Sequence, residues 1–181
     1  HSFIFFLLIV VLLSYGQLVK MYVWQDDNAL FFKLAHIKER AGYLGEGPFG
    51  IGPYKYTATP YIPIYHLFGF ETKAYFAFTL ALYFITTIIV YKVFSSILGG
   101  TAGKIAGFLY AAGYVASDGF IRLFNSVITS LSIILISILT YFYWKFYQSK
   151  KAIWYFLSLA TFFLAIEFAR ARTHYLIIII I

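Results

Sequence analysis

Residues 2–19 read SFIFFLLIVVLLSYGQLV and contain no charged side chain. About 20 consecutive apolar residues are enough for a helix to cross the hydrocarbon core of a bilayer. The stretch is longer than the apolar part of a typical signal peptide, and no small-residue cleavage pattern accompanies it, which favours a retained helix. The chain is therefore predicted to cross the membrane with its first residues.

The composition supports the same class of protein. Hydrophobic residues make up 62% of the 181 residues and charged residues only 12%, whereas soluble domains carry roughly 25% charged residues. The net charge is +7. The basic residues lie between apolar runs and form no continuous basic surface, so they are interpreted as residues that flank membrane spans and not as a nucleic-acid site. The absence of cysteine excludes disulfides and thiolate metal sites.

Four more apolar runs follow, and a further one begins at Tyr175; the four cover Ala74–Val93, Ile105–Ala116, Phe124–Tyr143 and Ala152–Ile166. Backbone groups in hydrocarbon must be satisfied within each segment, so these runs predict helices. The predicted fold is all-α, a polytopic transmembrane helix bundle of five spans plus the start of a sixth. Because the chain starts with His1 and ends inside an apolar run, residues 1–181 are expected to be a single transmembrane domain from a longer protein.

The short connections set the predicted orientation, because cytoplasmic loops are enriched in lysine and arginine. The connections after the second and fourth spans hold five lysines and no acidic residue: Lys92, Lys104, Lys145, Lys150 and Lys151. The N-terminus is then cytoplasmic, and residues 20–73 form the first extracytoplasmic loop. We expect an integral, multi-pass protein of a plasma or inner membrane rather than of the endoplasmic reticulum.

The loop 20–73 has two parts. From Asp27 to Ala41, apolar residues recur at helical spacing and basic residues fill the other positions, which predicts an amphipathic helix in the membrane interface, with membrane lipids as partners. Asp26 or Asp27 is expected to cap its N-terminus. Residues 42–65 are rich in glycine, proline and tyrosine and are predicted to lack regular structure. Their tyrosines are interpreted either as interfacial anchors or as platforms that stack on a sugar.

Three features in this order carry a resemblance. An acidic pair, Asp26-Asp27, opens the large outer loop; the stretch YTATPYIPIY at residues 56–65 leads into the second span; and SDGFIR occupies residues 117–122. In this order the chain resembles the N-terminal part of C-type membrane glycosyltransferases. Within them it is most similar to the dolichyl-phosphate-mannose–protein mannosyltransferase and aminoarabinose transferase group.

The resemblance implies a transferase that uses a sugar carried on a polyprenyl phosphate and an acceptor hydroxyl that the sequence does not identify. Asp26 matches the first acidic position and is the candidate general base. Asp27 matches the second, where the family has glutamate. Arg170 and Arg172 are candidates for binding the donor phosphate, since a guanidinium suits phosphate oxygens; the alternatives are snorkelling anchors or an inverted topology.

A second polar layer is assigned to four residues: Asp118, Arg122, Lys33 and His66. Asp118 and Arg122 are also compatible with a local ion pair. No cofactor is predicted, although His66 or His174 could contribute to a divalent metal site through the fold. The acidic pair itself could serve only to cap the interfacial helix. The alternative functions are a lipid or sugar transporter or flippase, and a noncatalytic membrane subunit.

Overall fold

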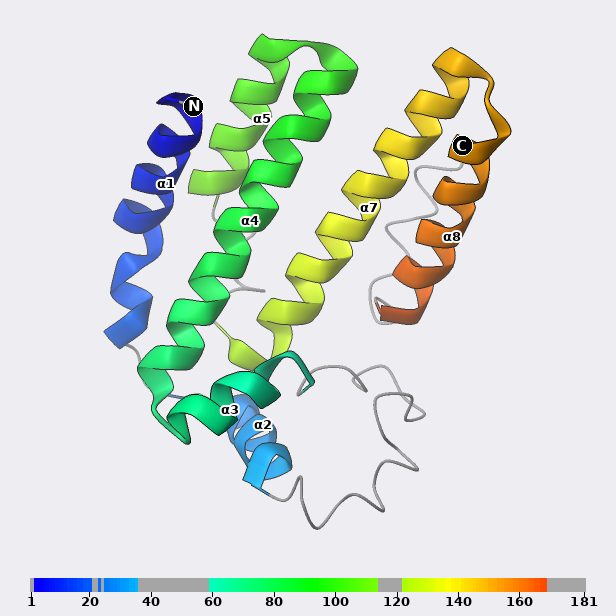
Figure 1. Ribbon diagram of the computed structural model, residues 1–181. Helices are drawn as coiled ribbons and strands as arrows, with labels where there is room; N and C mark the ends of the chain where they lie inside the picture. The colour runs from blue at the N-terminus through cyan, green and yellow to red at the C-terminus, as the bar shows by residue number, and fades with distance from the viewer. Residues whose placement is uncertain (1, 21–22, 24, 36–58, 114–121, 169–181) are drawn as a thin grey trace.

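The computed structural model describes residues 2–20, 23, 25–35, 59–113 and 122–168. Within these ranges the chain is all-α, with seven α-helices and two 3-10 helices (Figure 1). In chain order they are α1 (Ser2–Tyr15), η1 (Gly16–Lys20), α2 (Gln25–Ala35), η4 (Thr59–Tyr61), α3 (Ile62–Phe68), α4 (Thr72–Leu98), α5 (Gly100–Ala112), α7 (Leu123–Ser149) and α8 (Ala152–Phe168). The predicted fold class is confirmed at this level.

Three of the described helical segments are long and apolar enough to cross a membrane: Ser2–Lys20, Thr72–Leu98 and Asn125–Ser149. They indicate an integral, multi-pass membrane protein. Large apolar side chains are exposed on the outer faces of the bundle, among them Leu13, Phe94 and Phe163. Contiguous exposure of this kind is unusual for a soluble monomer and suits contact with lipid tails.

The second predicted span is longer than the sequence indicated, because α4 runs from Thr72 to Leu98. Lys92 therefore lies within α4 and Lys104 within α5, and the connection between the two helices is the single residue Gly99, whose φ is 93°. This left-handed backbone is one that glycine adopts without steric cost. The predicted basic loop is thus a tight turn flanked by two lysine-bearing helices.

Two predicted spans correspond to shorter helices. α5 has 13 residues and begins at Gly100 rather than Ile105; at 1.5 Å per residue it is about 20 Å long, against a hydrocarbon core of about 30 Å. α8 has 17 residues and is about 26 Å long by the same measure. The run that begins at Tyr175 lies outside the described residues, so the count of five spans and a sixth stays a prediction.

The outer loop is more regular than predicted. η4 and α3 occupy Thr59–Phe68, so the end of the glycine- and proline-rich part is helical. α2 begins at Gln25, which places both aspartates inside its first turn and not before it; the capping prediction was wrong in position. Acidic residues in a first turn still interact favourably with the helix dipole.

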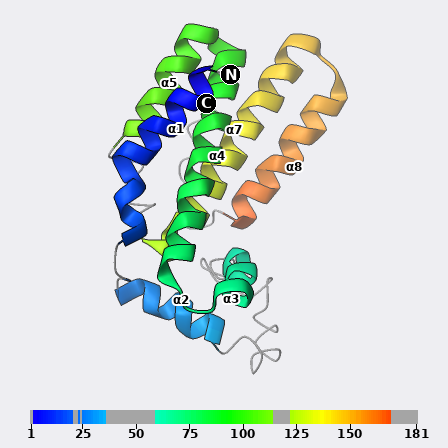
Figure 2. The same ribbon diagram turned by 60° about the vertical axis from the view of Figure 1, so that its left-hand side comes forward.

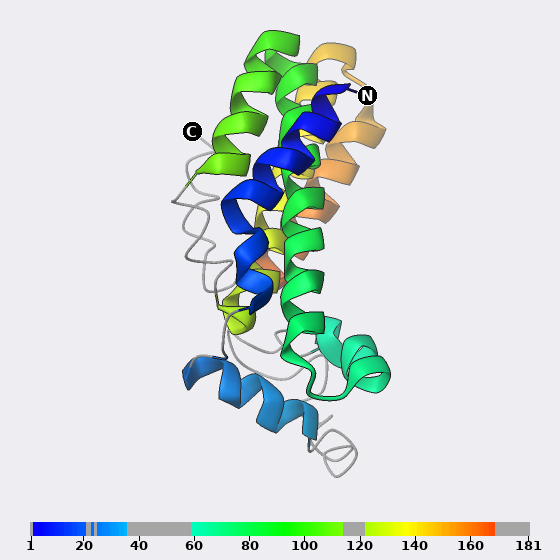
Figure 3. The ribbon, with the colours of Figure 1, turned by 90° about the vertical axis from the view of Figure 1, so that its left-hand side faces the viewer.

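α2 also packs differently from the prediction. Its apolar positions Leu30 and Leu34 are fully buried against the protein, in a cluster with residues of η4, α4 and α7. The helical period was predicted correctly, but the apolar face covers the end of the bundle instead of facing lipid. Figure 3 shows α2 lying across the ends of the spans.

Small residues allow α5 to pack closely against α4. Gly103, Gly107 and Ala111 recur every fourth residue and are the buried residues of α5. A Cβ on Gly103 would lie 1.9 Å from Ser95 Oγ and 2.6 Å from the Ser95 backbone nitrogen, and a Cβ on Gly107 would lie 2.9 Å from Tyr91 Cβ. This spacing is typical of close helix packing in membranes.

α5 ends about halfway along α4, beside Tyr83, and its last carbonyl groups are satisfied by tyrosines (Figures 1 and 3). The hydroxyl of Tyr83 donates to the carbonyl of Tyr110, and the hydroxyl of Tyr15 donates to the carbonyl of Gly113 at 3.0 Å. The carbonyls at a helix end have no partner within the helix. Side chains from α1 and α4 thus close the end of α5 away from water.

The close approach of α5 and α4 predicts that Gly103→Ala lowers the free energy of unfolding by about 2–3 kcal/mol, since the added methyl overlaps Ser95 backbone atoms. Gly100→Ala is the matched control, because nothing lies within 4 Å of its Cβ position. We expect this control to be neutral or slightly stabilising, as alanine favours helix. Unfolding in detergent micelles, followed by circular dichroism, measures both; equal effects of the two variants would contradict the packing.

Candidate functional site

The polar residues of interest gather at one end of the bundle. α2 and α3 lie together there, beside the first residues of α4 and α7 (Figures 1 and 2). The α4–α5 turn lies at the opposite end. If α4 and α7 cross a membrane, as their length and composition allow, this end lies near one membrane boundary. The helix that carries Asp26 and Asp27 would then lie at that boundary.

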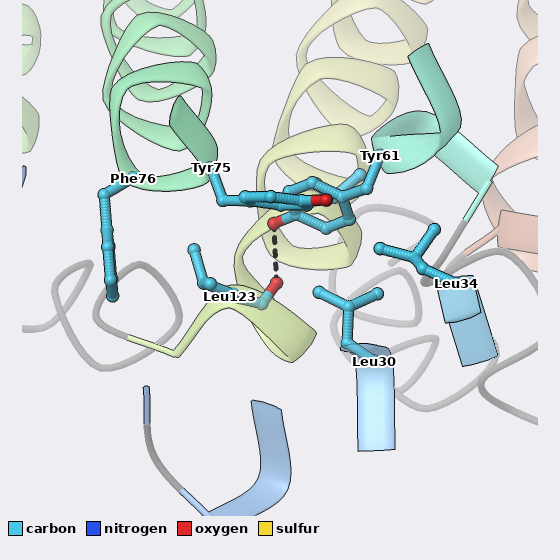
Figure 4. Close-up of a cluster of buried hydrophobic side chains, with 7 residues drawn as sticks. Leu30, Leu34, Tyr61, Tyr75, Phe76 and Leu123 are labelled. Carbon is cyan, nitrogen blue, oxygen red and sulfur yellow. Dashed lines mark hydrogen bonds between the residues drawn. The ribbon is translucent and has the colours of Figure 1, made fainter. Parts of the chain in front are cut away.

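One face of α2 is buried in this region. Asp27, Leu30 and Leu34 are each fully buried, and their spacing of three and four residues places them on one side of the helix. The two leucines join Tyr61, Leu123 and other residues in a single apolar cluster (Figure 4). Asp27 is thus the first residue of the helix face that packs α2 against the bundle.

Tyr61 links the outer loop to the start of α7. Its ring is fully buried, and its hydroxyl donates to the carbonyl of Leu123 at 2.7 Å. The same hydroxyl lies 2.9 Å from Ser126 Oγ, which itself donates to the Leu123 carbonyl at 3.0 Å. A buried hydroxyl needs such partners, because leaving one unpaired costs about 1–3 kcal/mol. Two hydroxyls therefore converge on one backbone carbonyl at the beginning of α7.

The electrostatic setting keeps this tyrosine neutral. Burial raises the pKa of the Tyr61 hydroxyl far above its ordinary value of 10.0, the hydrogen bond with Ser126 opposes the rise, and the negative charge of Asp27 adds to it. The carboxylate of Asp27 therefore acts on Tyr61 through space. The hydrogen-bonded contact itself joins η4 to α7, through Tyr61, Leu123 and Ser126.

Tyr75 connects the beginning of α4 to the same region. Its hydroxyl donates to the carbonyl of Gly69 at 2.6 Å, immediately after α3, where Gly69 has a φ of 58°. The Tyr75 ring lies 4.9 Å from the Phe31 ring and 5.6 Å from the Tyr61 ring, measured between centroids. The first turn of α4 is thereby tied to α2 and to the end of α3.

The structure describes only some of the predicted site residues, and those lie near one end of the bundle. The structure brings the helices that carry Asp26, Asp27, Lys33 and His66 to one end of the bundle, and Arg122 directly precedes α7 there. Asp27 is buried, whereas His66 and Arg122 are exposed. The side chains of Asp26 and Lys33 lie outside the described residues, as do Asp118, Arg170, Arg172 and His174 altogether.

The described part of the chain holds no cluster of metal-binding side chains. No group of three or more histidine, cysteine, aspartate or glutamate residues there could hold a metal ion. His66 lies on the exposed side of α3, with its ring 6.0 Å from that of Tyr65.

Tyr61, Tyr75 and Ser126 were not singled out from the sequence. The tyrosines of the outer loop were interpreted as interfacial anchors or sugar platforms, and for Tyr61 neither holds in this structure, because its ring has no exposed surface. The signal that points to Tyr61 is its position between Pro60 and Pro63, which initiates a helix turn. Its hydrogen-bond partners lie more than 60 residues away and have no local pattern.

Loss of the Tyr61 hydroxyl is expected to weaken the fold. Tyr61→Phe removes the hydroxyl that donates to the Leu123 carbonyl and contacts Ser126, and should lower the free energy of unfolding by about 1–2 kcal/mol. Tyr147→Phe, at an exposed position of α7, is the matched control and should leave stability unchanged. Denaturant titration of both variants in micelles makes the comparison; an unchanged midpoint for Tyr61→Phe would rule out the hydrogen-bonded junction.

The raised pKa of Tyr61 also predicts a pH dependence. Below about pH 10 the tyrosine is neutral in both folded and unfolded chains, and its contribution to stability is fully present. Above that pH the unfolded chain loses the proton while the folded chain keeps it, so stability falls by up to about 1.4 kcal/mol per pH unit. Unfolding of wild type and Tyr61→Phe between pH 8 and pH 11 measures this slope. Parallel curves for the two proteins would show that Tyr61 titrates normally.

Comparisons with protein-family models, with curated proteins and with solved structures found no match to this chain. What the chain does is therefore argued from its own residues.

Proposed function

We propose that this chain is part of a membrane glycosyltransferase that moves a sugar from a polyprenyl-phosphate donor to an acceptor hydroxyl on the extracytoplasmic side. The proposal includes the orientation predicted from the lysine-bearing connections, with the N-terminus in the cytoplasm. It also includes the remaining crossings predicted from the sequence and a C-type glycosyltransferase architecture.

The observation that carries the proposal is the position of the acidic pair. Asp26 and Asp27 occupy the first turn of α2, and α2 lies across the end of the candidate spans. A lipid-borne donor presents its phosphate and sugar at this depth. A carboxylate at the boundary can remain ionised and still reach a group held by the lipid. Acidic residues at membrane depth are energetically costly, so their presence there suggests a function.

The two aspartates receive different roles. Asp27 is fully buried, and its charge raises the pKa of Tyr61, which suits a residue that positions α2 on the bundle. Asp26 precedes it by one residue, a rotation of about 100° around the helix axis. We therefore assign the general base to Asp26 and a positioning role to Asp27. The family resemblance assigned the base to the same first position.

The proposed step is a displacement at the anomeric carbon. Asp26 accepts the proton of the acceptor hydroxyl while the oxygen forms a bond to that carbon. The bond between the anomeric carbon and the phosphate oxygen breaks, and the polyprenyl phosphate leaves with the electron pair. Cations fixed near the departing phosphate stabilise the charge that develops on it, and Arg170 and Arg172 are proposed for this task. Arg122, His66, Lys33 and Asp118 are proposed as the surrounding polar layer.

One observation favours a second candidate, a transporter or flippase for a lipid or sugar. α5 stops about halfway along the candidate span α4, with its terminal carbonyls held by Tyr15 and Tyr83. Helices that end at membrane depth are frequent beside the substrate sites of transporters. A noncatalytic membrane subunit is the third candidate function, and it predicts that substitution of either aspartate leaves function unchanged.

The test uses the protein reconstituted in proteoliposomes, with a panel of polyprenyl-phosphate sugars as donors. Asp26→Asn should reduce sugar transfer or donor hydrolysis by about 10²-fold or more, since general-base catalysis contributes 10²–10⁴-fold, and should lower the free energy of unfolding by no more than the helix-dipole contribution of about 0.3–1 kcal/mol. Asp27→Asn should lower the unfolding midpoint and reduce turnover less.

Three outcomes would overturn the proposal. Full turnover by Asp26→Asn would remove that residue from the chemistry. Donor translocation across the bilayer without sugar transfer would favour the transporter. Binding of a donor that neither turns over nor responds to either substitution would favour the noncatalytic subunit.

A further inference from the structure

A groove of about 300 Å³ lies between α4 and α7, at the end of the bundle opposite α2. Residues of α4 form most of its wall, and α7 contributes one aromatic ring. The lining residues are Ile88, Ile89, Lys92, Val93, Ser96 and Tyr141. Figure 1 shows α4 and α7 diverging toward this end. The groove is separate from the acidic end and has no part in the proposed transfer reaction.

The groove is lined mainly by apolar side chains and also by one lysine. Ile88, Ile89 and Val93 give an aliphatic surface that matches a hydrocarbon chain. Lys92 is exposed on α4, only six residues before the end of that helix at Leu98. Ser96 Oγ donates back to the carbonyl of Lys92 at 2.9 Å, so its proton is already used within α4.

A second lysine approaches from α7. The Lys145 ammonium lies 5.7 Å from the centroid of the Tyr141 ring, which lines the groove, and 5.2 Å from that of Trp144. Lys92 lines the groove itself, and Lys145 lies near one of the lining rings, that of Tyr141. Basic pockets between membrane helices bind phosphate-bearing lipid headgroups, and each lysine near such a surface contributes about 1 kcal/mol.

From this arrangement we propose that the groove is a binding site for one anionic phospholipid. An acyl chain lies over Ile88, Ile89 and Val93, and the headgroup phosphate lies between Lys92 and Lys145. The chain is held there by van der Waals packing, because a lipid tail that leaves other lipid or detergent gains no hydrophobic transfer energy. The charge of the two lysines selects an anionic headgroup over a zwitterionic one. The inference does not depend on the proposed enzymatic activity.

The experiment measures lipid bound to the delipidated, full 181-residue chain in detergent by native mass spectrometry. Dioleoyl phosphatidylglycerol is the probe, with dioleoyl phosphatidylcholine and inorganic phosphate as comparisons. Wild type should bind phosphatidylglycerol in preference to the other two. Lys92→Gln should weaken this binding about fivefold, as expected for the loss of one lysine near the headgroup.

Lys104→Gln is the matched control. Lys104 is also exposed and lies in the first part of α5, near the same end of the bundle, but its ammonium is over the Phe3 ring at 5.9 Å and outside the groove. It should bind phosphatidylglycerol as wild type does. Ile89→Trp, which fills the groove while keeping both lysines, should also reduce binding.

Four results would overturn the site. Equal losses for Lys92→Gln and Lys104→Gln would show general attraction to charge. Equal binding of the two lipids would show that the lysines select nothing. Binding of inorganic phosphate as tight as that of phosphatidylglycerol would show a phosphate site without a lipid chain. Unchanged binding by Ile89→Trp would place the lipid elsewhere.

Discussion

Hydrogen bonds from buried tyrosine hydroxyls to carbonyls at helix ends are the interactions on which the rest of this structure depends. In hydrocarbon a backbone carbonyl without a partner costs several kcal/mol, so a helix end near the membrane core needs a donor. Tyr15 and Tyr83 supply donors to the end of α5, and Tyr75 supplies one to Gly69 after α3. Tyr61 differs, because the carbonyl of Leu123 that it binds lies at the beginning of α7, where helix carbonyls also have partners within the helix; its bond joins η4 to α7. The bonds of Tyr15, Tyr83 and Tyr61 join elements that are distant in sequence, that of Tyr75 is local, and each tyrosine also contributes a large ring to the packing.

This arrangement explains why the fold class was predictable and its details were not. Apolar runs of about 20 residues identify candidate membrane-spanning helices from composition alone, and Ser2–Lys20, α4 and α7 follow that rule. The period of Asp27, Leu30 and Leu34 likewise predicts a helix with one buried face. What that face contacts depends on α7, which follows almost a hundred residues later, so no local pattern could distinguish burial in protein from contact with lipid.

The candidate site was predictable only in part for the same reason. Position beside the first span identified Asp26 and Asp27, and their helix does lie at the end of the bundle. The burial of Asp27 and the hydrogen-bonded junction of Tyr61 with Ser126 could not be predicted, because they involve elements that are distant in sequence. The tight α4–α5 turn was missed because Lys92 and Lys104 suggested a loop, whereas long lysine stems can extend from helices to the membrane surface.

The bundle has two chemically different ends. The end that holds α2 carries charges of both signs, since the aspartates of α2 lie near Lys20, Lys73 and Arg122, whereas residues 92–104 and 144–151 at the opposite end contain lysines and no acidic residue. If α4 and α7 cross a bilayer, these ends face opposite compartments. The asymmetry would hold the spans in one orientation, because lysine-bearing ends remain on the cytoplasmic side.

The most direct test of this account is the sidedness of the two ends. The chain contains no cysteine, so single cysteines can be introduced without background at two exposed positions, Asn28 in α2 and Ser149 at the end of α7. Sealed, oriented membrane vesicles are then treated with a membrane-impermeant maleimide before and after permeabilisation. The account predicts that Asn28→Cys reacts from the extracytoplasmic side only and Ser149→Cys from the cytoplasmic side only. Reaction of both positions from the same side of intact vesicles would contradict it.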